Sequence, residues 1–99
     1  MIRWSADSVA RLTAIEAHVA EDNPYAVERL VAKLMERAEG LASHPAVGRR
    51  VPEAPSREAL REVVEGNYRI VYRAAADKIV EIVTVIEGHL GFARATLRR

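Results

Sequence analysis

Residues 61–73 have the sequence Arg-Glu-Val-Val-Glu-Gly-Asn-Tyr-Arg-Ile-Val-Tyr-Arg, which is two strand-like segments separated by a Gly-Asn pair. Such a pair suits a two-residue turn, and the flanking valine, isoleucine and tyrosine residues favour strands, so the stretch predicts a β-hairpin. With Gly66 and Asn67 as the turn, the predicted cross-strand pairs are Glu65 with Tyr68, Val64 with Arg69, Val63 with Ile70, Glu62 with Val71 and Arg61 with Tyr72.

The alternation of side chains along a strand divides this hairpin into two faces. The face expected to pack on the rest of the protein carries Val63, Ile70, Tyr68 and Tyr72, together with Arg61 and Glu65. The other face carries Glu62, Val64, Arg69, Val71 and Arg73. There Glu62 is diagonal to both Arg69 and Arg73, within reach of long side chains. Two interpretations are open: a site that binds an anion or a partner or attacks a phosphodiester, and a surface ion-pair ladder that contributes little to stability.

Two amphipathic segments precede the hairpin and predict a pair of antiparallel helices. Ser5 is placed to cap a helix over about residues 6–21, in which apolar residues recur at every third or fourth position. Asn23 and Pro24 then suit the N-cap and the first residue of a second helix over about residues 24–42. So short a connection favours an antiparallel helical hairpin.

The remaining segments predict a sheet. Residues 45–59 contain three prolines and a glycine and are expected to form a loop. Strands are expected at residues 2–4 and at about 60–65, 68–74 and 78–86, followed by a tail over 88–99. The last strand has apolar residues on both faces and is predicted to be interior. This order predicts one α+β domain, residues 1–99, with the helical hairpin packed on a mostly antiparallel sheet of about four strands.

Composition excludes several classes of function. The 99 residues include no cysteine, which removes disulfides and thiolate metal sites, and no apolar run reaches the 18 residues of a membrane span. A reducing, cytoplasmic location is therefore expected, without a membrane partner. The three histidines lack the spacing of metal ligands, and no phosphate-binding or dinucleotide-binding motif is present, so neither a metal nor a cofactor is expected. Net charge is −2 over residues 1–48 and +3 over residues 49–99.

The side chains that could carry chemistry are Glu62, Arg69, Arg73 and His89. Cleavage of RNA by transesterification needs a base, an acid and cations beside the phosphate, and these residue types could supply all three. A solvated loop histidine is the alternative for His89. The basic C-terminal segment, with Arg94 and Arg98, is either a frayed tail or a segment that binds a partner.

The order and spacing of these signals resemble the RelE/ParE toxins of bacterial type II toxin–antitoxin systems. The resemblance covers all but about the last ten residues and rests on Trp4-Ser5, Glu21-Asp22-Asn23-Pro24, Gly48-Arg49, Arg61-Glu62, the run Gly66 to Arg73, and Val85-Ile86-Glu87-Gly88-His89. It implies a toxin neutralised by a cognate antitoxin, which also mediates any contact with operon DNA. RelE-like members cut messenger RNA on the ribosome, whereas ParE-like members poison DNA gyrase and are not known as enzymes.

The resemblance is greater to the ParE-like branch. Gly48-Arg49 and the strand after Asn67 are similar to that branch, and the many lysines and the C-terminal tyrosine of RelE-like nucleases are missing. Arg11 and His18 depart from the family pattern in the first helix. A gyrase poison is therefore expected, with partner contacts through Arg61, Glu62, Arg69, Arg73, His89, Arg94 and Arg98. One alternative is a ribosome-dependent endoribonuclease that uses Glu62, Arg69, Arg73 and His89. The other is an unrelated α+β adaptor whose exposed sheet face only binds another protein.

Overall fold

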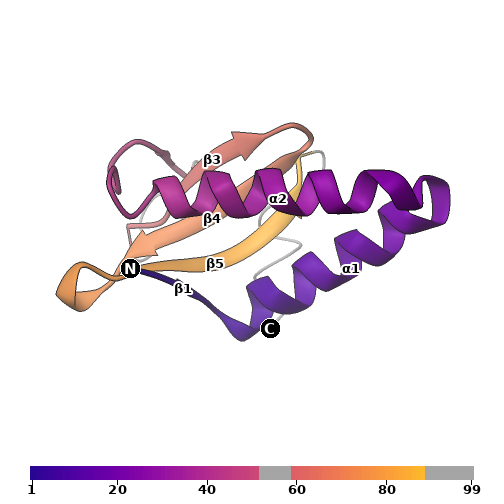
Figure 1. The fold of residues 1–99 in the computed structure, drawn as a ribbon. Helices are drawn as coiled ribbons and strands as arrows, with labels where there is room; N and C mark the ends of the chain where they lie inside the picture. The colour runs from indigo at the N-terminus through magenta and orange to yellow at the C-terminus, as the bar shows by residue number, and fades with distance from the viewer. Residues whose placement is uncertain (52–58, 89–99) are drawn as a thin grey trace.

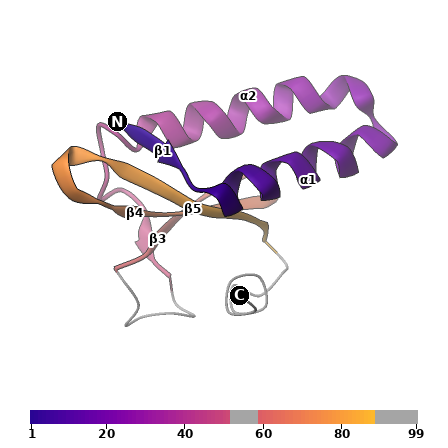
Figure 2. The same cartoon turned by 90° about the horizontal axis from the view of Figure 1, so that it is seen from below.

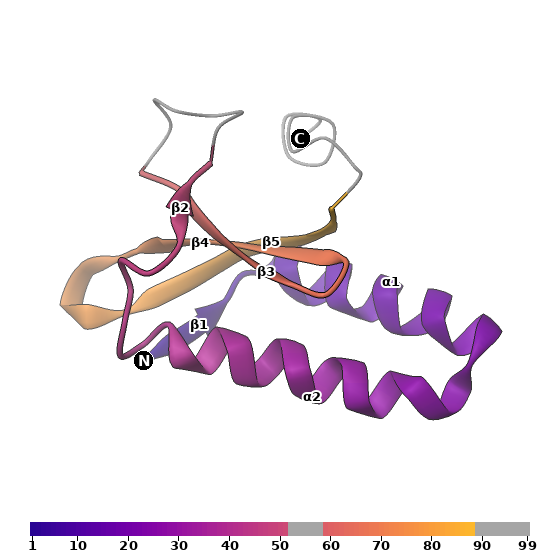
Figure 3. The same ribbon diagram turned by 90° about the horizontal axis from the view of Figure 1, so that it is seen from above.

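The computed structural model describes residues 1–51 and 59–88, which form a two-layer α+β fold (Figure 1). Its elements in chain order are β1 (Ile2–Trp4), α1 (Ala6–Asp22), α2 (Pro24–Gly40), β2 (Arg49–Arg50), β3 (Arg61–Glu65), β4 (Tyr68–Ala74), a 3-10 turn (Ala76–Lys78) and β5 (Val80–Glu87). Both helices lie on one face of the sheet (Figures 2 and 3). No helix within these two ranges is long and apolar enough to cross a membrane. The fold class predicted from the sequence is confirmed.

The helical hairpin begins and turns at the residues expected to cap it. The Ser5 hydroxyl accepts a hydrogen bond from Ser8 N at 3.0 Å, and Asn23 Oδ1 accepts one from Tyr25 N at 3.2 Å. Asn23 N also donates to Val19 O at 2.8 Å, so one residue ends α1 and starts α2. Pro24 is the first residue of α2, where a missing N–H leaves no helical bond unmade.

The sheet has the strand order β1-β5-β4-β3-β2, with β1 parallel to β5 and every other pair antiparallel. The predicted register of β3 and β4 is confirmed at all five pairs, and Gly66 has the positive φ of 60° that the turn requires. Five strands are present where about four were expected. The additional strand, β2, lies in the predicted loop 45–59, where two arginines give no alternating pattern to signal a strand.

β5 is an interior strand, as predicted, and a β-bulge explains why both of its faces are apolar. Val71 pairs with Thr84 while Tyr72 pairs with Ile82, so Val83 is an extra residue on β5. Before the bulge, Val80 and Ile82 face the helices, and after it Val85 does. The alternation of side chains along β5 thus shifts by one residue at the bulge. Because the Ser5 hydroxyl donates to Val83 O at 2.8 Å, the bulge is tied to the start of α1.

Apolar side chains are buried on both faces of the sheet. The main core lies between sheet and helices and is made of Leu34, Ala38, Leu41, Val63, Ile70, Tyr72, Val80, Ile82 and Val85. A second, smaller cluster lies on the opposite face and is made of Val51, Leu60, Val71 and Ile86. The face that carries Glu62 and Arg69 therefore has an apolar centre that can bury charged neighbours.

Candidate functional site

Glu62 is the centre of the charged site on the sheet face opposite the helices. Its side chain is fully buried, and it lies between two guanidinium groups. Arg69 Nε donates to Oε1 at 2.9 Å, and Arg69 Nη2 donates to the same oxygen. Arg49 Nε donates to Oε2 at 2.6 Å. Both carboxylate oxygens are therefore occupied by charge-assisted hydrogen bonds, which are the strongest that a carboxylate makes with side chains.

Arg73 does not join this site, contrary to the expectation from the sequence. Its Nε donates to Glu81 Oε1 at 2.9 Å, and Arg3 Nη2 lies 3.5 Å from the other oxygen of Glu81. Arg73 is directly opposite Glu81 in the register of β4 and β5, and a directly opposite partner is closer than a diagonal one such as Glu62. The predicted contact of Glu62 with Arg69 is confirmed, and its predicted contact with Arg73 is wrong.

Arg49 takes the place predicted for Arg73 because Gly48 brings β2 against β3. A Cβ at Gly48 would lie 2.6 Å from Glu62 O and 2.6 Å from the Tyr72 hydroxyl, so only glycine fits. Gly48 N donates to that buried hydroxyl at 2.8 Å, and the hydroxyl donates to Pro45 O at 2.8 Å. The resulting pairing places Arg49 directly opposite Glu62.

Arg61 supports the same segment from the other face of β3. Its Nη1 donates to Gly48 O at 2.7 Å and to Ala46 O at 3.4 Å. The Arg61 side chain therefore fixes the backbone just before β2. The partner contact expected for Arg61 stays a prediction. His89, Arg94 and Arg98, predicted to bind a partner, lie outside the described residues, as does most of the predicted tail 88–99.

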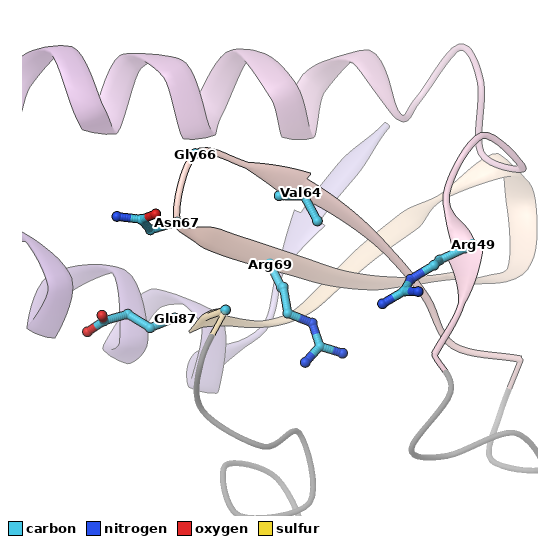
Figure 4. Close-up of a pocket in the computed structure, with 7 residues that line it drawn as sticks. Arg49, Val64, Gly66, Asn67, Arg69 and Glu87 are labelled. Carbon is cyan, nitrogen blue, oxygen red and sulfur yellow. The ribbon is translucent and has the colours of Figure 1, made fainter.

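A pocket of about 570 Å³ opens beside the two arginines (Figure 4). Arg49 and Arg69 point to the same side of the sheet, away from the helices, whereas the Glu87 side chain points away from both. The pocket is lined by Arg49, Val64, Gly66, Asn67, Arg69, Glu87 and Gly88. The site thus combines two guanidinium groups, one exposed apolar side chain and the backbone of the hairpin turn.

A smaller groove of about 150 Å³ lies between α1 and the sheet. It is lined by Arg11, Ala14, Ile15, His18, Tyr68, Val85, Ile86 and Glu87. Burial of the Tyr68 hydroxyl, and secondarily the negative charge of Glu87, raises the pKa of Tyr68 above its ordinary value of 10.0. Within residues 1–51 and 59–88, no three side chains of histidine, aspartate or glutamate come together in a way that could hold a metal ion.

Two residues of the charged face were missed as site candidates, Arg49 and Glu81. The pair Gly48-Arg49 was noticeable in the sequence, but only the close approach of Gly48 to β3 connects Arg49 to Glu62. Glu81 follows from alternation along β5 once its alignment with Arg73 is known. Cross-strand neighbours of this kind depend on strand order, which the sequence of one strand does not contain.

The helical hairpin on one face of a mixed five-stranded sheet matches the fold of solved toxins from ParE and RelE systems. The fold is similar to that in a chromosomal ParDE TA system from P. aeruginosa, with a TM-score of 0.73 and 18% identity over 87% of this chain and 92% of that one. It is also similar to a chain of the toxin–antitoxin complex RelBE2 from Mycobacterium tuberculosis, with a TM-score of 0.61 and 23% identity over 88% and 95% of the two chains.

Sequence comparison identifies the family. The "ParE toxin of type II toxin-antitoxin system, parDE" family matches residues 2–89. A curated protein of Sinorhizobium fredii, "Putative toxin Y4kP", is 38% identical over 91 residues, which are 89% of this chain and 88% of that protein. The chain therefore belongs to the ParE toxin family of type II toxin–antitoxin systems, and the RelE/ParE resemblance noted in the sequence is confirmed.

Proposed function

We propose that this toxin acts as a poison of DNA gyrase, by binding and not by catalysis. The target follows from the resemblance of the sequence to the ParE-like branch. The observation that best supports the proposal is the state of Glu62, whose side chain is buried and whose two oxygens each accept hydrogen bonds from a guanidinium group.

A nuclease built on these residues would need Glu62 as a base. A general base must come within about 2.6–3.2 Å of the proton that it removes, directly or through one water. Glu62 has no exposed oxygen that could accept the proton of a ribose hydroxyl. Arg73 is bound to Glu81 and does not lie beside Glu62 to hold a phosphate there. This geometry favours a binding role for the charged face over the alternative of a ribosome-dependent endoribonuclease.

A cognate antitoxin in the cytoplasm is the second partner that we propose. Both similar structures come from toxin–antitoxin systems. The helical layer offers apolar surface for such a partner, since Val9, Tyr25 and Met35 are large exposed hydrophobic side chains on α1 and α2. The groove between α1 and β5 adds Ile15 and Tyr68. Contact with operon DNA would be made by the antitoxin.

The test compares two purified targets. Toxin added to a gyrase supercoiling reaction should inhibit it, and toxin added to programmed ribosomes should leave the message intact. His89→Ala removes one of several expected contacts and should leave gyrase inhibition largely intact, whereas loss of a general acid typically costs a nuclease about 10²-fold or more. Cleaved message together with unaffected supercoiling would contradict the proposal.

A further inference from the structure

We infer that the pocket beside Arg49 and Arg69 binds a carboxylate side chain from an acidic segment of the protein that the toxin targets. The chemistry of this inference rests on the pocket alone. Only the identity of the partner rests on the proposed function.

Arg49 is an exposed guanidinium that is already held in position. Its side chain is 67% exposed, yet its Nε is fixed at 2.6 Å from the fully buried carboxylate of Glu62. Within residues 1–51 and 59–88, its two terminal amino groups form no hydrogen bond or ion pair with another side chain. Arginine binds carboxylates through a rigid, planar fork, and a fork that is fixed in advance loses less conformational entropy on binding.

The rest of the pocket suits an amino-acid side chain. Val64 is 58% exposed and forms an apolar wall against which methylene groups can pack. The turn residues Gly66 and Asn67 also line the pocket. At about 570 Å³ the pocket is within the ordinary size range of ligand sites.

Local charge favours a single carboxylate over a nucleic acid strand. Arg49 presents one exposed guanidinium, whereas the Arg69 side chain is only 9% exposed and is bound to Glu62. One carboxylate matches the single charge of the Arg49 fork. A nucleic acid strand carries a row of phosphates and needs several exposed cations along its backbone. An acidic protein segment is thus the partner that the pocket fits.

The direct test is titration of the toxin with an acetylated and amidated peptide that carries a single glutamate, followed by NMR of the arginine Nε–Hε signals. Saturable shifts of the Arg49 signal are expected. Arg49→Gln should weaken binding by about tenfold or more, because a charge-assisted hydrogen bond contributes enough to change affinity by that factor. Arg49→Lys should also weaken it, since an ammonium group lacks the fork. Unchanged peptide binding by Arg49→Gln would overturn the inference.

Arg3→Gln is the matched control. Arg3 is also an exposed arginine paired with a carboxylate on the same sheet face, but it lies on β1, outside the pocket. The affinity of the Arg3→Gln variant for the peptide should stay within about twofold of the wild-type value, as expected for loss of an exposed ion pair. A single-stranded oligonucleotide and inorganic phosphate are titrated in parallel. Tighter binding of the oligonucleotide than of the peptide, or loss of peptide binding in Arg3→Gln, would also overturn the inference.

The gyrase assay separates this inference from the proposed function. Loss of inhibition in Arg49→Gln, with inhibition retained in Arg3→Gln, supports the pocket as the contact with gyrase. Full inhibition by Arg49→Gln overturns that contact. Failure of the wild-type toxin to inhibit gyrase overturns the proposed function, while Arg49-dependent peptide binding would still support the carboxylate site.

Discussion

Replacement of Gly48 by alanine tests how the charged site is assembled. The added methyl group would lie 2.6 Å from Glu62 O, 2.6 Å from the Tyr72 hydroxyl and 2.8 Å from Tyr72 Cε1. These atoms belong to the backbone of β3 and to a tyrosine ring that is fully buried, so neither can move away cheaply. The substitution should therefore push β2 away from β3 and separate Arg49 from Glu62.

The expected cost combines two effects. Forcing an extra methyl group into a packed interior typically costs about 1–3 kcal/mol. Displacement of β2 also breaks the 2.8 Å hydrogen bond from Gly48 N to the Tyr72 hydroxyl, which contributes about 0.5–1.5 kcal/mol. The free energy of unfolding should thus fall by about 2–4 kcal/mol. Tyr72→Phe, which removes the hydroxyl alone, should cost about 1–3 kcal/mol because it leaves two polar groups without their partner.

Urea denaturation measures the cost, and NMR of the Arg49 Nε–Hε signal reports whether the contact with Glu62 survives. Gly40→Ala is the matched control, because Gly40 ends α2 and a Cβ there meets nothing within 4 Å. That control should stabilise the protein by about 0.4–1 kcal/mol. A change below about 0.5 kcal/mol for Gly48→Ala, with the Arg49 signal unshifted, would refute the close-approach argument.

Three other outcomes follow from the same structure. Glu62→Gln should destabilise the protein by about 3 kcal/mol or more in urea denaturation, because it leaves the buried Arg69 guanidinium without its counter-charge. Arg73→Gln removes a more exposed ion pair and should cost less than about 1 kcal/mol. Lys78→Gly should raise the free energy of unfolding by about 0.5–1 kcal/mol, since Lys78 has a φ of 60°, and an unchanged or lower value would contradict this. Burial, and secondarily the charge of Glu87, raises the pKa of Tyr68 in the folded state, so the unfolded state loses the hydroxyl proton first and stability should fall as pH rises above 10. Tyr68→Phe should reduce that fall in thermal melts. An unchanged dependence of the melting temperature on pH would contradict this prediction.

Local sequence signals account for most of the elements. The Gly-Asn turn sets the register of β3 and β4 because a two-residue loop leaves one way to pair the strands that follow it. Ser5 and Asn23 set where the helices begin because their side chains bond to the first free N–H groups of each helix. In both cases the deciding contacts join residues within a few positions of one another.

Cross-strand contacts were harder to predict than the elements. The site was expected to join Glu62 to Arg69 and Arg73, and one of these two pairs is present. Arg73 has Glu81 as a nearer partner only because β5 lies beside β4, and the bulge at Val83 alters the alternation of β5 in a way that no periodic pattern signals.

The sequence by itself determined the helical hairpin, the β3–β4 hairpin and which hairpin side chains face the helices, because turn geometry, capping and strand alternation act between near neighbours in the chain. Only the tertiary structure decided that β2 exists, that Arg49 and not Arg73 completes the pair around Glu62, and that this carboxylate is buried. Those outcomes depend on how closely Gly48 approaches a strand that lies more than ten residues away in the chain.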